Sequence, residues 1–285
     1  MLNSKKILII EKFTGLECVQ NHLDNGDYGN VSLLELEKFH NEHVTTRAVL
    51  QKLFEKSNLE YNLVKVDLIN GLSLENYDFV VSLGGDGTFL EAAKHITKQI
   101  LIGVNSEVDR SVGYLTSFNI SNLDEITKQI LKQNINLENW ERISVRINGQ
   151  NTSFLALNEV FIGHPKIYKT SHLLVSAGEK KSYFSGNGLV VSTFKGSTAF
   201  YKSGGGQGFE AGNFGFASLL NYRAVGNLEK DMVLDGNSVL QISPKRLGQS
   251  IIFDGDEGRE IILNQDDLVE VCLDANNFLK VMILV

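Results

Sequence analysis

Proline and cysteine are both scarce in this sequence, whose 285 residues include two of each against 26 glycines. Cys18 and Cys272 lie far apart and form no CxxC pair, which argues against a disulfide framework and indicates a reducing compartment. The apolar run at residues 7–10 is too short for a signal peptide or a membrane span, and no Arg-rich transit sequence is recognisable. We therefore expect a cytoplasmic protein without membrane contact.

Positive charge is also in deficit. The sequence has 27 Lys and Arg residues against 34 Asp and Glu residues, a formal net charge of −7, and it has no basic run. Nucleic-acid-binding proteins concentrate Lys and Arg on one face, so this balance argues against a nucleic-acid partner. An acidic protein that binds anionic nucleotides must attract them locally, with backbone N–H groups and a few basic side chains.

The first part of the chain, residues 1–137, is predicted to form an α/β domain. Apolar runs at 7–10, 62–66, 77–83 and 101–105 are typical of buried strands, and helices are expected over 44–57, 90–98 and 121–133, the last with Ser121 as N-cap. Alternating strands and helices favour a parallel sheet covered by helices. Residues 15–41 are polar and interrupted by Gly26 and Gly29, which predicts an irregular insertion.

The second part, residues 138–285, is predicted to form an antiparallel β domain. Asn148-Gly149 lies between two strand-like segments and is a strong hairpin signal, and Gly178 lies between another such pair. Further short strands are expected at 239–242, 250–253, 259–263, 268–273 and 278–284. Short strands and turn residues without helical periodicity indicate a β-rich domain.

A glycine-rich loop, residues 83–90 with the sequence LGGDGTFL, follows an apolar run and precedes a helix. Glycines let the backbone approach a phosphate closely, and a helix N-terminus adds N–H donors and a partial positive charge. Asp86 would repel phosphates unless a hydroxyl group or a metal ion lies between them. The loop fits neither GxGxxG nor the P-loop pattern. The alternative interpretation is a tight strand-to-helix turn with Asp86 as N-cap.

Residues 84–88 (GGDGT) resemble the signature shared by NAD kinases, diacylglycerol and sphingosine kinases and, more loosely, phosphofructokinases. In the lipid kinases an Asn-Glu pair follows this loop almost at once, whereas here Asn158-Glu159 comes much later, which is its place in NAD kinases. Residues 186–200 (GNGLVVSTFKGSTAF) resemble the DGxxxSTPxGSTAY segment of the same family. The segments 103–106, 109–113 and 253–255 resemble the divergent branch that includes the mitochondrial NAD kinases of animals.

The resemblance implies that Asp86 contacts the 2′-hydroxyl of the adenosine ribose of NAD and acts as general base. Asn158 and Glu159 would hold ribose hydroxyls and the diphosphate region of NAD. Arg110 would contact donor phosphates, and Asp254 would contact the nicotinamide end. The other implied binding residues are Gly84, Gly85, Gly87 and Thr88 along the phosphates, Asn187 in the NAD pocket, and Thr198, Ala199 and Ser203 around adenine.

Some positions depart from the family or have a structural alternative. Asn187 replaces an aspartate, Phe194 a proline, and Phe200 a tyrosine. Asn158-Glu159 could end a surface hairpin, and Arg110 could be a solvated loop residue. His40 and His43 have HxxH spacing, but the nearby Glu37 and Glu42 favour a surface helix over a metal site. Residues 254–258 (DGDEG) lack the ligand spacing of a calcium loop and indicate an acidic hairpin.

The family implies the two-domain NAD kinase and diacylglycerol kinase fold, with a donor-binding domain at 1–137 and an NAD-binding domain at 138–285. It implies phosphoryl transfer from ATP, another triphosphate or polyphosphate to NAD, with Mg²⁺ or another divalent cation accompanying ATP and no metal site built from protein side chains. A homodimer or homotetramer is expected. The alternatives are a lipid or sugar kinase of the same superfamily and a non-catalytic NAD-binding sensor.

Overall fold

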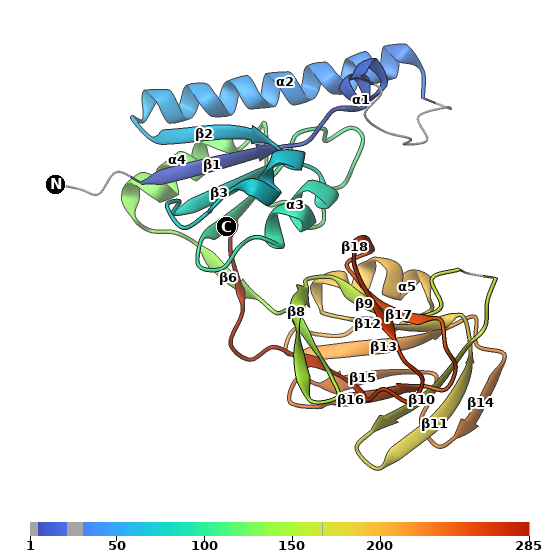
Figure 1. Ribbon diagram of the computed structural model, residues 1–285. Helices are drawn as coiled ribbons and strands as arrows, with labels where there is room; N and C mark the ends of the chain where they lie inside the picture. Colours follow the sequence, from blue (N-terminus) through green and yellow to red (C-terminus); the bar gives the residue numbers. More distant parts are fainter. Residues whose placement is uncertain (1–4, 22–30, 167, 285) are drawn as a thin grey trace. The chain divides into compact units, whose positions relative to one another are not determined.

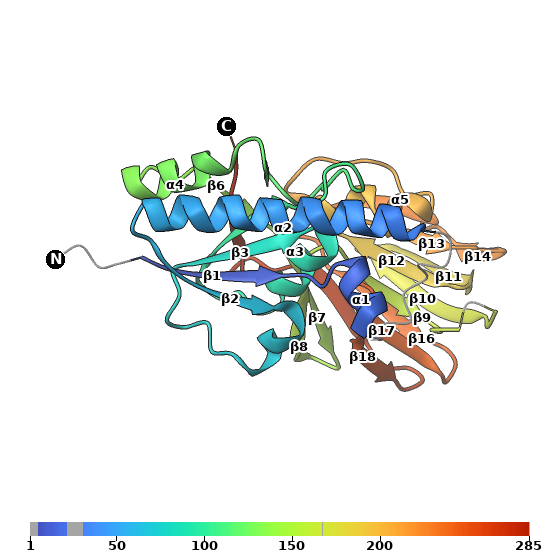
Figure 2. The same cartoon turned by 90° about the horizontal axis from the view of Figure 1, so that it is seen from above.

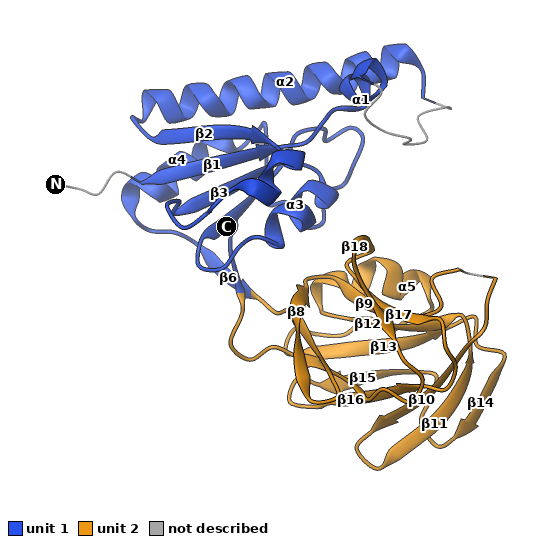
Figure 3. Cartoon of the chain, viewed as in Figure 1, with its two compact units in different colours: residues 1–139, 279–285 blue, residues 140–278 orange. Residues whose placement is uncertain are grey.

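The computed structural model of the chain describes residues 5–21, 31–166 and 168–284. The chain divides into two compact units, coloured separately in Figure 3. Unit 1 comprises Met1–Asn139 and Leu279–Val285, and unit 2 comprises Trp140–Phe278. Unit 1 contains a parallel sheet with helices and unit 2 contains antiparallel strands, so the predicted fold class is confirmed.

Four parallel strands form the centre of unit 1, in the order β2-β1-β3-β4. They are β1 (Lys6–Glu11), β2 (Glu60–Lys65), β3 (Phe79–Gly84) and β4 (Ile100–Asn105). β3 is buried along its whole length and β1 beyond its first residue, as expected for parallel strands that are covered on both faces. Because carboxyl ends of parallel strands meet at one edge of a sheet, the residues that follow Glu11, Gly84 and Asn105 come together there.

Helices cover both faces of this sheet (Figures 1 and 2). On one face, α2 (Leu33–Lys56) and α4 (Leu123–Lys132) lie side by side over a core that includes Phe54, Ile126 and Ile130. On the other face, α3 (Asp86–Ala93) packs against β3 and β4, so closely that a Cβ at Gly103 would lie 2.8 Å from the Phe89 ring. The glycine loop thus enters a helix that is fixed against the sheet.

The carboxylate of Glu11, at the end of β1, gathers three basic groups in the interior of unit 1. Glu11 is 2 % exposed, and its oxygens lie 3.2 Å from His43 Nε2, 3.0 Å from an Arg47 nitrogen and 3.3 Å from Lys65 Nζ. Burial alone would raise the pKa of Glu11, but the His43 hydrogen bond and the charges of Lys65 and Arg47 lower it to about 2. His43 was expected on a surface helix; instead it is buried, and its Nδ1 lies 2.8 Å from Ser106 Oγ.

The segment predicted to be an irregular insertion is largely helical. α1 (Gly15–Asn21) and α2 occupy most of residues 15–41, and residues 22–30 lie outside the described residues. Ser32 and Glu35 form a capping box at the start of α2, in which each side chain accepts a hydrogen bond from the backbone N–H of the other. Leu33 and Leu34 in the first turn are exposed, so no helical apolar face marks the start of α2 in the sequence.

Two other helix boundaries also differ from the prediction. α3 begins at Asp86, directly after Gly85, and ends at Ala93, whereas a helix was expected over 90–98. α4 begins at Leu123 with Asn122 as its N-cap, one residue after the predicted Ser121. The early start of α3 matters for function, because it puts the loop's aspartate in the first turn of a helix.

Unit 2 is a sandwich of two antiparallel sheets that share one apolar core. One sheet has the order β14-β11-β10-β16-β19-β7-β8 and the other β15-β13-β12-β9-β17-β18. Asn148 and Gly149 have φ angles of 52° and 80°, so the predicted hairpin is confirmed. The bounds are β7 (Ile143–Ile147), β8 (Gln150–Ala156), β9 (Glu159–Gly163), β10 (Ser171–Ala177), β11 (Lys180–Gly186), β12 (Gly188–Ser192), β13 (Asn213–Leu219), β14 (Arg223–Gly226), β15 (Asp231–Asp235), β16 (Leu240–Pro244), β17 (Gln249–Phe253), β18 (Asp256–Leu263) and β19 (Val269–Leu273), with two short helices, η2 (Lys195–Thr198) and α5 (Phe200–Ser203).

The last strand belongs to unit 1, which corrects the predicted second domain at residues 138–285. β20 (Leu279–Met282) pairs in parallel with β4, and β6 (Leu137–Trp140) follows it in the sheet. A short β5 (Phe118–Asn119) also pairs with β4, and η1 (Val66–Gly71) follows β2. A short apolar strand looks the same in either kind of sheet, so the sequence pattern could not assign β20.

Met282→Ala should destabilise unit 1, because Met282 is fully buried in the core beneath α2 and α4. Removing a buried side chain of this size costs about 2–5 kcal/mol. We expect lower protection from hydrogen exchange in α2 and α4, measured by mass spectrometry, with β9 and β12 unchanged. Leu284→Ala, at a half-exposed neighbouring position, is the control. Loss of protection confined to unit 2 would contradict the placement of β20.

Candidate functional site

The glycine loop of unit 1 makes a turn from β3 into α3 that tolerates no side chain at its first position. A Cβ on Gly84 would lie 2.2 Å from the Oγ1 of Thr88, which is buried. Gly85 is the N-cap of α3, and the first helical hydrogen bond runs from Phe89 N to Gly85 O. The N–H groups before Phe89 therefore lie at the open helix end, where an anion can bind. A Cβ on Gly87 would meet no atom within 4 Å, so this part of the loop is open.

Asp86 is bound to a second segment of unit 1 and does not cap the helix. Its carboxylate oxygens accept hydrogen bonds from Tyr114 N at 3.1 Å and Leu115 N at 2.8 Å. The alternative of Asp86 as N-cap is therefore wrong, since Gly85 holds that position. A carboxylate offers about four acceptor positions. Two backbone donors fix the orientation of the Asp86 carboxylate. Its remaining acceptor positions can accept a hydrogen bond from a further donor, such as a hydroxyl group.

Basic side chains beside the glycine loop are organised by a buried carboxylate, Glu107. Its oxygens lie 2.6 Å from Lys12 Nζ and 3.4 Å from an Arg110 nitrogen, and its side chain is 3 % exposed. Arg110 also lies over the ring of Phe39, 5.6 Å from the ring centroid, and is about one-third exposed. Arg110 is therefore exposed, but two contacts hold its side chain, and its contact with donor phosphates stays a prediction. Lys12 was not identified from the sequence, because a single lysine after a strand carries no motif.

A cavity of about 400 Å³ opens beside this loop within unit 1. Gly87 and Thr88, both predicted phosphate-binding residues, contribute to its wall. Lys12 is the basic residue of the lining, and Asp67 and Glu91 are its acidic residues. The other lining residues are Phe13, Cys18, Val66 and Asn70. This cavity is the candidate site for a phosphorylated ligand in unit 1.

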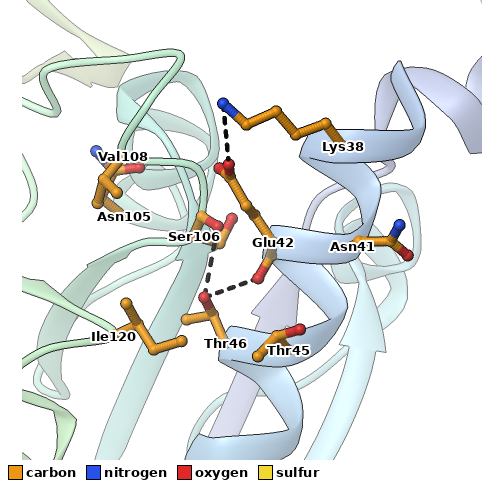
Figure 4. A pocket seen from close by; sticks show the side chains of 9 residues that line it. All are labelled: Lys38, Asn41, Glu42, Thr45, Thr46, Asn105, Ser106, Val108 and Ile120. Atoms are coloured by element: carbon orange, nitrogen blue, oxygen red, sulfur yellow. Dashed lines mark hydrogen bonds and ion pairs between the residues drawn. The ribbon is translucent and has the colours of Figure 1, made fainter. Parts of the chain in front are cut away.

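A second cavity in unit 1, of about 380 Å³, lies between α2 and the end of β4 (Figure 4). Thr46 Oγ1 donates to Glu42 O at 2.9 Å, and Lys38 Nζ lies 3.7 Å from the Glu42 carboxylate. Burial and the nearby Asp109 raise the pKa of Glu42. None of the predicted site residues lines this cavity, so we do not include it in the candidate site.

Unit 2 contains a cavity of about 440 Å³ that brings together residues from separate motifs. Glu159 from β9, Asn187 between β11 and β12, and Ser203 from α5 all line it, and all three are among the residues expected to bind NAD. Phe200, which departs from the family's tyrosine, lies here with its ring centroid 6.4 Å from that of Phe161. The sequence did not identify the other lining residues, which are Phe161, His164, Pro165, Gly204, Leu219, Leu220, Ile252, Gly255 and Glu257.

The Asn158-Glu159 pair is buried, which excludes the alternative of a surface hairpin end. Each residue is 8 % exposed, and Asn158 Oδ1 and Glu159 Oε2 have no hydrogen-bond partner among the described residues. Burial and the nearby charge of Asp254 raise the pKa of Glu159 to about 7. Buried polar atoms without a protein partner are costly, so both side chains are available to bind a ligand.

Asp254 lies behind this pair and does not line the cavity. Its carboxylate accepts hydrogen bonds from the backbone N–H groups of Leu157 (3.0 Å), Asn158 (2.7 Å) and Glu159 (3.2 Å), and it pairs with Arg259 at 3.2 Å. Burial raises the pKa of Asp254, and these donors oppose that shift. The expected contact with a nicotinamide ring has no support in this placement, because the carboxylate is 3 % exposed and its acceptor sites are used within the protein. The turn at Asp254-Gly255, with φ angles of 51° and 67°, confirms the acidic hairpin.

The segment at residues 193–199 (TFKGSTA) contacts the backbone at Leu157 and Asn158 directly. Thr193 Oγ1 donates to Leu157 O at 2.6 Å, and a Cβ on Gly196 would lie 2.2 Å from Asn158 O. Lys195, next to the departure at Phe194, lies 4.1 Å from the centroid of the Trp140 ring. Thr198 is exposed and Ala199 half-exposed; neither lines the cavity, whereas Ser203 does. Predicted contacts of Thr198 and Ala199 with adenine stay predictions.

Metal-ligating side chains do not gather at either cavity. Among the described residues there is no group of three or more His, Cys, Asp or Glu side chains placed to hold a metal ion. No helix in the described part of the chain combines the length and apolar character that a membrane span needs.

Comparisons with known proteins agree with the resemblance seen in the sequence. The profile of the ATP-NAD kinase N-terminal domain matches residues 30–135. Over 197 residues the chain is 34% identical to a protein named NAD kinase 2 from Oceanobacillus iheyensis, and this stretch covers 61% of the chain and 73% of that relative.

Two solved structures share the fold. An NAD kinase from Archaeoglobus fulgidus in complex with ATP has a TM-score of 0.68 at 18% identity, covering 97% of this chain and 93% of that one. Yeast NADH kinase complexed with NADH has a TM-score of 0.69 at 14% identity, covering 100% of this chain and 85% of that one. At these identities the likeness shows the fold.

Glu159→Gln should change how stability depends on pH. The Glu159 carboxyl has a pKa of about 7 in the folded protein, against 4.5 for an ordinary glutamate. Below about pH 4.5 it is protonated in the folded and the unfolded chain, and the fold keeps its full stability. As the pH rises through 7 this stability is lost, because the unfolded chain releases the proton more easily than the folded one. We expect the variant to gain stability relative to the wild type between pH 4.5 and pH 8, by up to roughly 3 kcal/mol.

Urea unfolding at several pH values measures this difference, with Glu260→Gln, an exposed glutamate on β18, as control. A constant difference between Glu159→Gln and the wild type across this range would show that Glu159 ionises normally.

Proposed function

This chain belongs to the NAD kinase family, and on that premise we propose how its two units divide the transfer of a phosphoryl group from ATP to the adenosine ribose of NAD. Unit 1 provides the donor site and the catalytic carboxylate, Asp86. Unit 2 provides the NAD pocket around Glu159. The reaction produces NADP, phosphorylated at the 2′-hydroxyl.

The observation that carries this proposal is the convergence of Glu159, Asn187 and Ser203 on one cavity of unit 2. Glu159 belongs to the Asn-Glu pair, whereas Asn187 lies in the segment 186–200 and Ser203 lies just after it, so two separated parts of the sequence meet at one cavity, as a shared ligand would require. Phe161 and Phe200 supply apolar ring surface, as a nucleotide pocket requires for a base. Asn158 Oδ1 and Glu159 Oε2 are buried and have no partner among the described residues. Both oxygens can accept hydrogen bonds that the hydroxyl groups of a ribose donate.

Phosphoryl transfer of this kind needs little covalent chemistry from the protein, because positioning and charge stabilisation provide most of the rate. Asp86 is held by two backbone N–H groups, so its free acceptor sites have a defined direction. We assign Asp86 to orient the attacking hydroxyl and to accept its proton. Gly84, Gly85, Gly87 and Thr88 let the phosphates approach the start of α3, and Arg110 offsets negative charge beside them.

A divalent cation fits this site as a companion of the nucleotide. Mg²⁺ is usually bound by one or two carboxylates together with substrate phosphates, so a three-residue protein cluster is not required. Two carboxylates could hold the cation. Asp67 lines the unit 1 cavity, and Asp86 precedes Gly87, which also lines it. When bound, the cation would neutralise part of the charge of the donor phosphates.

We also propose that the protein acts in the cytoplasm as a homodimer or homotetramer. Cys18 and Cys272 are both free thiols, which suits a reducing compartment. β14 is an edge strand with every residue exposed, and such an edge can pair with a second copy of the chain. Light scattering on the purified protein would measure the number of subunits.

The deciding experiment incubates the purified protein with NAD, ATP and Mg²⁺ and measures NADP with a coupled dehydrogenase. Parallel reactions with other triphosphates and polyphosphate identify the donor, and reactions with NADH test the acceptor. If the protein binds NAD by calorimetry yet forms no NADP with any donor, it is a sensor and the proposed activity is wrong.

Asp86→Asn should keep the fold and NAD binding but slow turnover by about 10²–10⁴-fold, equivalent to about 3–5 kcal/mol of barrier. The amide can still accept one of the two backbone hydrogen bonds of Asp86, so the loop should stay in place. Turnover is measured by NADP formation and binding by calorimetry. Near-normal turnover would remove Asp86 from the role of base.

Asn158→Ala should weaken NAD binding by about 5- to 150-fold, because it deletes an acceptor in a buried site, worth about 1–3 kcal/mol. ATP binding should stay unchanged, since the donor site lies in unit 1. The hydrogen bond from Asn158 N to Asp254 is a backbone contact and survives the substitution. Titration calorimetry with each nucleotide makes the comparison, with Asn151→Ala on β8 as control. Equal losses for both nucleotides would indicate a folding defect.

A further inference from the structure

Lys12 lies directly above the start of the glycine loop, as the strand register requires. β1 pairs with β3 so that Glu11 stands beside Leu83, and Lys12 N donates to Leu83 O at 3.2 Å. On its other side, β3 pairs with β4 so that Gly84 stands beside Asn105. Glu107 follows Asn105 closely. Lys12 and Glu107 therefore leave the sheet on opposite sides of β3.

The ion pair between these residues has to cross the carboxyl end of β3. Adjacent strands lie about 4.8 Å apart, so β1 and β4 are separated by roughly 10 Å with β3 between them. Lys12 Nζ and Glu107 Oε1 are nevertheless 2.6 Å apart. The ammonium group is thus placed over the point where Gly84 and Gly85 turn into α3. This edge, where loops from neighbouring parallel strands diverge, is where ligands bind in open α/β sheets.

Lys12 has unused capacity to bind an anion. Its side chain is 19 % exposed and contributes to the wall of the 400 Å³ cavity, together with Gly87 and Thr88. Within the described residues Glu107 is the ion-pair partner of its ammonium group, and an ammonium has three N–H donors. Lys65 differs: it contacts Glu11, Glu17 and the carbonyl oxygen of Lys12, so its donors are used within the protein.

Negative charge at this edge makes a cation necessary. Asp67 and Glu91 line the cavity, and Asp86 lies in the glycine loop. Glu107 is buried beside Lys12. A triphosphate adds several more negative charges. A buried ion pair by itself is weak evidence of a stabilising role, because desolvation of both groups offsets their attraction.

We propose that Lys12 binds the phosphate chain of the donor, and that Glu107 is a positioning residue that holds the Lys12 ammonium over the glycine loop. Glu107 lies 3.4 Å from Arg110 as well, so one buried carboxylate sets the place of two cations. The inference deepens the proposed function and rests on it for the identity of the donor. It also makes a separate claim, that this site binds a phosphate chain.

The test uses four variants of the full-length protein: Lys12→Met, Lys12→Arg, Glu107→Gln and the double variant Lys12→Met/Glu107→Gln. Calorimetry measures binding of inorganic triphosphate and of ATP with Mg²⁺, and steady-state kinetics give KM for ATP and NAD separately. We expect Lys12→Met to weaken triphosphate binding and raise KM for ATP by about 10- to 100-fold, as for loss of a charged hydrogen bond. KM for NAD should stay unchanged. Lys12→Arg should keep much of the affinity.

The double variant separates ligand binding from a purely structural role. Lys12→Met alone leaves Glu107 without its closest cation and should lower the melting temperature, whereas the double variant removes both charges and should restore it. If Lys12 binds phosphate, triphosphate affinity in the double variant is lower than in Glu107→Gln alone, because Glu107→Gln by itself already accounts for any loss that comes through Arg110. If stability and triphosphate affinity both recover, Lys12 serves only as a partner for Glu107 and the proposal is overturned.

Two comparisons complete the design. Lys5→Met, which removes a half-exposed lysine paired with Asp78 at the other end of β1, should change neither binding nor KM. A wild-type protein that binds triphosphate through Lys12 but forms no NADP would refute the kinase and leave the Lys12 site standing. A protein that forms NADP with normal KM for ATP after Lys12→Met would do the reverse.

Discussion

The chain carries a formal net charge of −7, and buried carboxylates fix the places of its basic groups in the described residues. Each of three such carboxylates holds basic groups at a defined place: Glu11 holds Arg47, Lys65 and His43, Glu107 holds Lys12 and Arg110, and Asp254 holds Arg259. A long basic side chain on an open surface would spread its charge over many conformations. Pairing it with a buried carboxylate fixes its position before a ligand arrives, which is preorganisation.

The glycine loop is the other part of the anion site that we propose, and here steric limits matter more than charge. Gly84 is required because Thr88 occupies the place where a side chain would lie. That contact lets α3 begin at Asp86, so the open N–H groups and the carboxylate belong to one helical turn. The segment at Tyr114 and Leu115 then anchors the carboxylate through its own N–H groups. The Asp86 carboxylate can share this loop with the open N–H groups because it is bound by a different segment of the chain.

The sequence was most informative where a residue type has no substitute. The alternation of the first half predicted the parallel sheet, and the Asn148-Gly149 hairpin predicted antiparallel strands. The Asn-Glu pair and the segment around 186–203 predicted Glu159, Asn187 and Ser203, which share a cavity. It was least informative where meaning depends on a distant partner. The position of the Lys12 side chain depends on its ion pair with Glu107, and β20 belongs to the parallel sheet because it pairs with β4. Neither contact leaves a local pattern, because each joins segments far apart in the chain.

Asp254 shows how one such distant partner can act on a site without lining it. Its carboxylate fixes the backbone of Leu157, Asn158 and Glu159 through three N–H groups, which aims the Asn158 and Glu159 side chains. Burial, together with the same negative charge, raises the pKa of Glu159 to about 7. Asp254 therefore holds the backbone at Glu159 and also adds to the raised pKa of its carboxyl group. Arg259 offsets part of the charge of Asp254, so two buried carboxyls can lie close together. Near neutral pH Glu159 is therefore able to accept a hydrogen bond from a ribose hydroxyl when ionised, or to donate one when protonated.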